Sequence, residues 1–251
     1  LDNAKWDEIK SIKLNNNKII LSNSNNTNIN LKKTNQIIGW ILSENSSLRE
    51  LILSKNNLHC RILINKNDSI GKNDPAHISD ILVESAISTI LDCEDSVATV
   101  DTDDKILAYK NWLGLIKGNL TTEFKKNNQN IKRILNKDIK FTLTNTKDSF
   151  LKGRSLMLIR NVGHLMTTPA ILTKDNKEIG EGIMDAIITT LIATYDFKKT
   201  ENKNSEFNSI YIVKPKMHGP GEVQFTDQLF TAIEKLLKLP INTIKIGIMD
   251  E

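Results

Sequence analysis

The stretch Ser155-Leu-Met-Leu-Ile-Arg-Asn-Val-Gly-His164 decides how the rest of the chain is interpreted. Residues 156–159 form an unbroken apolar run, which is typical of a strand buried on both faces of a parallel sheet. The run ends abruptly at Arg160 and Asn161, and His164 follows after Val162 and Gly163. Polar residues at this place predict a ligand site, because α/β proteins carry their chemistry at the carboxyl ends of parallel strands.

Three further apolar runs end in polar residues in the same way. They are Ile90–Ser96, Ile210–His218 and Thr243–Glu251. Amphipathic helices are predicted between the runs, over 103–117, 181–193 and 222–239. This alternation predicts an α/β fold, namely a partial TIM (β/α)8 barrel that comprises about its first half. Half a barrel has open edges, and the chain starts without Met, so we expect a fragment of a longer protein.

Residues 1–72 have a different character, rich in Asn, Lys and Ser. Apolar and polar residues alternate over 9–14, 18–22, 28–31 and 58–64, which predicts half-buried strands. The pieces 37–42 and 47–53 fit either a strand or a helix. Asp74 before Pro75 predicts a capped helix over 75–89. We therefore expect a small inserted α+β module over 1–72, followed by the partial barrel over 73–251.

Composition limits the classes of function. The 251 residues include 39% hydrophobic and 25% charged residues, which is typical of an ordinary globular protein. The net charge of +4 is scattered and only 5% of residues are aromatic, so no nucleic acid partner is expected. Cys60 and Cys93 form no CxxC pair, which argues against structural zinc and favours a reduced, cytoplasmic setting. No apolar run reaches about 18 residues, so no membrane span is expected.

Acidic residues follow the first apolar run. Asp92 and Glu94 alternate along a strand and so point to one side, where two carboxylates suit a hard cation directly or through its waters. A solvated acidic loop is the alternative interpretation. Glu251 ends the fourth run and is a further candidate Mg²⁺ ligand, or simply part of a tail.

Basic residues follow the second and third runs. Arg160 can clamp a carboxylate and stabilise an enolate, or it can form a structural ion pair with a nearby acid. Lys214, Lys216 and His218 alternate around Pro215. A Schiff-base lysine is one interpretation of this run, and the positioning of acidic groups is the favoured one.

Several short stretches of the sequence resemble those of a known family. The matching stretches are Asn73-Asp-Pro-Ala-His77, Ser88-Thr-Ile-Leu-Asp-Cys-Glu-Asp-Ser-Val97, Tyr109-Lys-Asn-Trp-Leu-Gly-Leu115, Gly153-Arg-Ser-Leu156, Ile159-Arg-Asn-Val-Gly-His-Leu-Met-Thr167, Tyr211-Ile-Val-Lys-Pro-Lys-Met-His-Gly-Pro220 and Gly247-Ile-Met-Asp-Glu251. They closely resemble malate synthase in its long, monomeric G form, from about residue 68 to the end. Residues 1–67 resemble that family's inserted α/β module more loosely.

The resemblance implies an acyltransferase of the glyoxylate bypass that condenses acetyl-CoA, glyoxylate and water to malate and CoA with Mg²⁺. Arg160 matches the catalytic arginine, which contacts glyoxylate and stabilises the enolate of acetyl-CoA. Glu251 matches one of two carboxylate ligands of Mg²⁺, which binds glyoxylate. Asp92 and Glu94 match acids that surround the metal and its waters. Ser96 and Arg133 match positions that contact acetyl-CoA.

The family's second metal carboxylate and its catalytic base lie beyond Glu251, the base in a C-terminal helical domain, so these residues alone are expected to be inactive. Two other interpretations remain open. A Mg²⁺-dependent CoA-ester lyase barrel of the citrate lyase β-subunit type shares the arginine and the acids, although the long first module and the run Lys214-Pro-Lys-Met-His-Gly-Pro220 favour the synthase. The second interpretation is a truncated product without catalytic activity.

Overall fold

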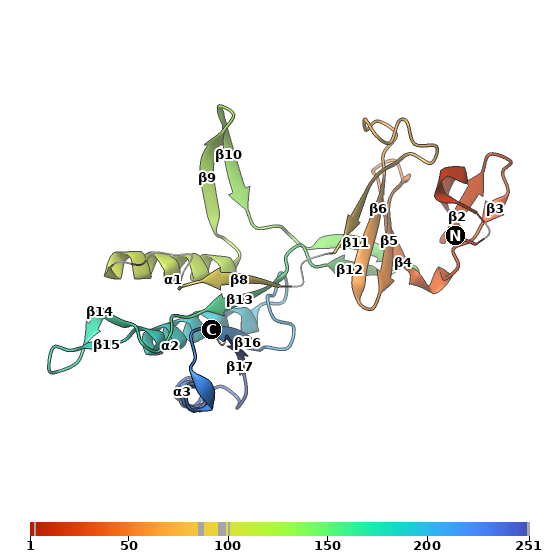
Figure 1. The fold of residues 1–251 in the computed structure, drawn as a ribbon. Helices are drawn as coiled ribbons and strands as arrows, with labels where there is room; N and C mark the ends of the chain where they lie inside the picture. Colours follow the sequence, from red (N-terminus) through yellow and green to blue (C-terminus); the bar gives the residue numbers. More distant parts are fainter. Residues whose placement is uncertain (3, 85–87, 95–98, 100, 250–251) are drawn as a thin grey trace. The chain divides into compact units, whose positions relative to one another are not determined.

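The computed structural model describes residues 1–2, 4–84, 88–94, 99 and 101–249. The chain divides into two compact units, and most of their strands and helices are labelled in Figure 1. Unit 1 comprises Leu1–Ala86 and Asp138–Gly153, and unit 2 comprises Ile87–Lys137 and Arg154–Glu251. These limits differ from the expected boundary at residue 72, because unit 1 continues past it and takes in a second, distant segment.

Unit 1 is built from two antiparallel sheets. The small sheet has the order β1-β2-β3, formed by β1 (Ile9–Asn15), β2 (Lys18–Asn23) and β3 (Asn28–Ile29). The larger sheet has the order β12-β11-β4-β5-β6-β7. Its strands are β4 (Ile37–Leu42), β5 (Leu48–Lys55), β6 (Leu58–Ile64), β7 (Ile78–Val83), β11 (Ile139–Leu143) and β12 (Asp148–Leu151). The four alternating runs of the sequence thus correspond to β1, β2, β3 and β6, as predicted.

The structure decides the two pieces of unit 1 that fitted either a strand or a helix. Both ambiguous pieces are strands, β4 and β5, and the described residues up to 84 contain only two 3₁₀ turns, η1 (Trp6–Glu8) and η2 (Thr34–Gln36), so the first module is a β structure there. The described residues of the range 75–89, namely 75–84 and 88–89, also form no helix. The Asp74 carboxylate accepts hydrogen bonds from the backbone N–H groups of Ala76 and Ile78, each at 2.9 Å, which closes a tight turn. β7 then pairs with β6, so tertiary pairing overrides the local helical pattern.

Unit 2 is organised around a four-stranded parallel sheet with the order β17-β16-β13-β8. Its strands are β8 (Ser88–Asp92), β13 (Leu156–Arg160), β16 (Ile210–Lys214) and β17 (Ile244–Ile248). Each of the four apolar runs supplies one strand, and the strands lie in chain order. The described residues form an open sheet and no closed barrel.

Three α-helices accompany this sheet, α1 (Thr102–Lys117), α2 (Glu181–Ala193) and α3 (Gly219–Leu236), which confirms the predicted helices. Asp101 caps α1, and Gly118 ends it with a left-handed φ of 82°. One apolar core joins helices and sheet. It includes Trp112 and Ile116 of α1, Ile159 of β13, Ile212 of β16, and Phe230 and Ile233 of α3.

Unit 2 also contains elements that the sequence did not predict. Two hairpins, β9 (Thr121–Lys126) with β10 (Gln129–Ile134) and β14 (Thr167–Leu172) with β15 (Glu178–Gly180), lie between the sheet strands in the chain. A 3₁₀ turn, η3 (Thr194–Lys198), follows α2. In the described part of the chain, every helix is too short or too polar to cross a membrane.

Candidate active site

Arg160 and Asp92 end two neighbouring strands of the parallel sheet and stand in register. Arg160 Nε donates to Asp92 Oδ1 at 2.7 Å, and Arg160 Nη2 donates to Asp92 Oδ2 at 2.6 Å. The side chains are only 13% and 12% exposed, respectively. The guanidinium is therefore held by a two-point fork, the arrangement that Arg forms best with a carboxylate. The structural ion pair that the sequence left open is present.

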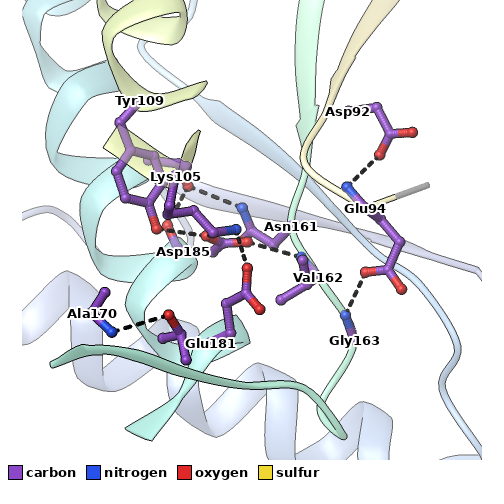
Figure 2. A network of polar contacts seen from close by, with 12 residues as sticks. Asp92, Glu94, Lys105, Tyr109, Asn161, Val162, Gly163, Ala170, Glu181 and Asp185 are labelled. Carbon is purple, nitrogen blue, oxygen red and sulfur yellow. Dashed lines mark hydrogen bonds and ion pairs between the residues drawn. The ribbon is translucent and has the colours of Figure 1, made fainter. Parts of the chain in front are cut away.

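Glu94 links three strand ends, and Figure 2 shows its contacts with Asp92 and Gly163. Its backbone N–H donates to Asp92 Oδ1 at 2.8 Å, while its Oε2 accepts from the Gly163 N–H at 2.8 Å. Its Oε1 accepts from Lys216 Nζ at 2.7 Å. Glu94 is thus tied to the chain that follows β13 and β16, as well as to Asp92. Lys216 positions an acidic group, which was the favoured interpretation of the third run.

The chain beyond Arg160 is held by ionisable side chains. Val162 N–H donates to Asp185 Oδ2 on α2 at 3.0 Å, and Val162 O accepts from Lys214 Nζ at 2.5 Å. Lys214 is fully buried. Burial lowers the pKa of Lys214 to about 8, against the opposing effect of Asp185 and Glu94. Lys214 therefore contacts a main-chain carbonyl rather than an acid.

A buried cluster between α1 and α2 supports Asp185. Lys105 forms ion pairs with Glu181 and, at 3.0 Å, with Asp185 Oδ1, which also accepts from Tyr109 Oη at 2.6 Å (Figure 2). Burial alone would lower the pKa of Lys105, but the two carboxylates raise it above its usual value. Burial, followed by Asp185, raises the pKa of Tyr109. The cluster thus keeps Lys105 charged and the phenol neutral.

Sequence reasoning did not single out this cluster. A signal existed in the spacing of its members, because Lys105 and Tyr109 lie four residues apart on α1, as do Glu181 and Asp185 on α2. Residues four apart share one helix face. Lys105 on one helix and the two acids on the next have opposite charges and lie on apolar helix faces. This pattern could have predicted that they contact one another.

The described residues offer some of the oxygen donors that a Mg²⁺ site needs. Carboxylate oxygens are the donors that Mg²⁺ prefers, and Asp92 and Glu94 supply them at one strand end. Both carboxylates are engaged by Arg160 and Lys216, and no cluster of three acidic, His or Cys side chains occurs among the described residues. This donor set fits hydrogen bonding to the waters of a cation, but not direct coordination by these residues alone.

Of the other predicted site residues, Arg133 lies on the β10 hairpin, and two lie outside the described part of the chain. Ser96 and Glu251 lie outside the described residues. Arg133 is exposed on β10, where its guanidinium lies over the Phe124 ring with 4.9 Å to the centroid. The network therefore unites Asp92, Glu94 and Arg160 of the predicted set.

The chain is similar to malate synthases over most of its length. Residues 156–251, which begin with β13, match the family model described as malate synthase, TIM barrel domain. The chain is 49% identical over 222 residues to malate synthase G of Halalkalibacterium halodurans, which covers 88% of this chain and 30% of the relative. It is 52% and 50% identical over 202 residues to the malate synthases G of Corynebacterium efficiens and Corynebacterium glutamicum, covering 80% of this chain and 27% of each relative.

The chain belongs to the malate synthase family. It spans about 30% of the length of the curated malate synthase relatives that it matches. The stretch that opens with Leu156 is therefore part of a malate synthase TIM-barrel sequence, and Arg160, the partner of Asp92, lies at the carboxyl end of its first matched strand.

Proposed function

We propose that the complete gene product containing these residues condenses acetyl-CoA, glyoxylate and water to malate and CoA, with Mg²⁺ as cofactor. The observation that carries this proposal is the fork between Arg160 and Asp92, in which Arg160 ends β13 within the segment that matches the malate synthase barrel and Asp92 ends the neighbouring strand β8. A planar cation fixed at a strand end suits a two-carbon keto acid, whose carboxylate it can bind.

Arg160 is the proposed catalytic residue. Its guanidinium contacts glyoxylate and stabilises the negative oxygen that develops when acetyl-CoA becomes an enolate. Asp92 fixes two of its nitrogen atoms, so the guanidinium needs little reorganisation during the reaction. Such fixed donors are most effective where burial excludes water, and the Arg160 side chain is only 13% exposed.

The remaining roles follow from the family resemblance. When bound, Mg²⁺ would polarise the keto acid as a Lewis acid. Glu251 is proposed as a direct ligand, while Asp92 and Glu94 accept hydrogen bonds from its waters. Ser96 and Arg133 are proposed to contact acetyl-CoA, and a basic residue on an exposed hairpin suits a phosphorylated cofactor. We also propose that the complete protein is a monomer, in which unit 2 forms the first half of the barrel.

The proposal is tested by purifying the complete gene product and measuring CoA release from acetyl-CoA with glyoxylate and Mg²⁺. We expect malate as the product and no turnover after chelation of divalent metal. Residues 1–251 assayed alone should release no CoA, since the family's base and second metal carboxylate are absent from them. Turnover by residues 1–251 would contradict this part of the proposal.

The same preparation discriminates the other interpretations. A CoA-ester lyase would cleave malyl-CoA to acetyl-CoA and glyoxylate and would not release free CoA during condensation. A protein without either activity would support a non-catalytic role. Free malate together with free CoA, in equal amounts, is the outcome that identifies the synthase.

A further inference from the structure

We propose that Lys214 and Asp185 are positioning residues, which hold the main chain directly after Arg160 and so fix the direction of its guanidinium. The inference rests on the proposed function, in which Arg160 contacts the substrates. Neither residue reaches the substrates in this proposal. Both act on the Val162 peptide groups, two residues beyond the arginine.

The parallel ladder ends before Val162. Arg160 pairs with Val213 of β16, and the Asn161 N–H donates to Val213 O at 3.1 Å as the last main-chain bond between these strands. Val162 is only 5% exposed, so water does not readily supply partners for its N–H and C=O groups. Buried main-chain groups without partners are costly, and side chains must replace the missing strand contacts.

The two replacements come from different elements and carry opposite charges. Asp185 on α2 accepts from the Val162 N–H at 3.0 Å, and Lys214 at the end of β16 donates to Val162 O at 2.5 Å. Both side chains are fully buried. Hydrogen bonds to charged groups are stronger and more directional than neutral ones. Gripping both polar atoms of one residue limits rotation of the chain on which Arg160 sits.

A glycine leaves room for this grip. A Cβ atom at Gly182 would lie 2.3 Å from Lys214 Nζ, 2.9 Å from Val162 O and 3.0 Å from Gly163 O. These distances are too short for real contacts, so any side chain at this position would displace the ammonium or the Val162–Gly163 backbone. The absence of a side chain at Gly182 is therefore a requirement of the contact between α2 and the chain after β13.

Further contacts hold Asp185 and the neighbouring Gly163 in place. Asp185 Oδ1 receives the Tyr109 hydroxyl and the Lys105 ammonium, while Oδ2 faces Val162. Gly163 is fixed separately by Glu94. Arg160 thus precedes a segment in which Asn161 and Val162 are each bonded to both β16 and α2, while Gly163 is bonded to Glu94. A solvated loop would be enough to end β13, so the buried charged contacts after it serve a further purpose.

The test uses three variants of the complete gene product. Lys214→Met keeps the length of the side chain and removes its donor. Gly182→Ala places a Cβ atom of α2 against the contact between Lys214 and Val162. It therefore tests the same contact if Lys214→Met fails to fold. Gly180→Ala is the matched control, because its Cβ would meet only the Ile183 side chain, with Cδ1 at 3.4 Å and Cγ1 at 3.6 Å, which are ordinary contacts. Deuterium exchange of the peptide covering 156–166 and steady-state kinetics are measured for each.

We expect the first two variants to exchange this peptide at least tenfold faster, with thermal unfolding still cooperative, and to lower kcat about tenfold or more while KM for acetyl-CoA changes less than twofold. Gly180→Ala should behave as the wild type. Lys214→Met combined with Arg160→Lys should lower kcat little more than Arg160→Lys alone, since Lys214 acts through Arg160.

A merely structural role predicts a different pattern, because a lost folded fraction multiplies the effect of Arg160→Lys. Multiplicative losses, or wild-type exchange and kcat in both variants, would overturn the proposal. If the wild type performs no condensation, the proposed function fails. The exchange data then still decide whether Lys214 holds the Val162 peptide.

Discussion

Arg160 shows how a single residue can be both an ion-pair partner and a catalytic candidate. Its fork with Asp92 uses Nε and Nη2, and Nη1 points to Met249 Sδ at 3.7 Å. The fork is what a lysine cannot reproduce, since its ammonium is a single point charge on a flexible stem. The planar geometry therefore matters beyond the positive charge.

We predict that Arg160→Lys lowers kcat of the complete gene product about 100-fold or more, because one fixed donor to a developing oxyanion contributes on this scale. Steady-state CoA release measures it. The exposed residue Lys174 provides the control substitution Lys174→Arg, which should leave turnover unchanged. Near-normal turnover of Arg160→Lys would refute the catalytic role.

Asp92 is expected to matter for both activity and stability. Asp92→Asn keeps the shape but removes the charge that faces a largely buried guanidinium, so unfolding should become easier by about 1–3 kcal/mol. Turnover should also fall, since Arg160 loses its fixed orientation. Urea unfolding and kinetics test this, with the exposed Asp175→Asn as the matched substitution. Equal stability of both variants would contradict the importance of the fork.

Cys93 gives a prediction about pH. Burial raises the pKa of its thiol to about 12 from 9.0, so between these values the folded protein keeps a proton that the unfolded chain loses. Stability from this group is complete below pH 9 and falls as pH rises, by up to about 1.4 kcal/mol per unit. Cys93→Ala should therefore flatten the loss of stability between pH 9 and 11, measured by thermal unfolding. The half-buried Cys60→Ala should flatten it less.

At the scale of elements, α1 depends on the residue that precedes it. The Asp101 side chain accepts from the Asp104 N–H at 2.9 Å, which satisfies one of the free N–H groups at the helix start. α1 also carries Lys105 and Tyr109, so fraying at this end would loosen the support of Asp185.

We predict that Asp101→Ala destabilises the protein by about 1 kcal/mol, the usual cost of losing such a cap. Asp101→Ser retains an acceptor and should retain most of the stability. Denaturant unfolding of the two variants measures the difference. Identical midpoints for Ala and Ser would show that the cap contributes nothing here.

At the scale of the whole molecule, unit 1 is assembled from two distant segments. Ile52 of β5 shares a buried cluster with Phe141 of β11 and Leu151 of β12. Residues 1–86 alone lack β11 and β12, so one side of this cluster is exposed and an edge of β4 is left unpaired.

We predict that residues 1–86 do not unfold cooperatively, whereas residues 1–86 joined to 138–153 by a flexible linker of about eight Gly and Ser residues do. Circular dichroism during heating distinguishes the two. Phe141→Ser in the joined protein removes a buried ring and should abolish the transition. A cooperative transition in residues 1–86 would show that the second segment is dispensable.

Much of unit 2 was predictable because its strands are buried on both faces. Apolar runs with abrupt polar ends are distinctive, and they located β8, β13, β16 and β17 as well as the meeting of Asp92, Glu94 and Arg160. The helix expected over 75–89 failed because a short apolar pattern fits either element, and only pairing with β6 decides. The roles of all six predicted site residues stay predictions, namely those of Asp92, Glu94, Ser96, Arg133, Arg160 and Glu251.

The sequence by itself determined the parallel strands, the three helices, the arginine at a strand end and the family, because these depend on local patterns and on matching words. Only the tertiary structure decided which partners Lys214 and Asp185 take, since each reaches the Val162 peptide from a separate element. It also decided that residues 138–153 complete unit 1. Contacts between distant segments depend on the three-dimensional course of the chain, which no local pattern contains.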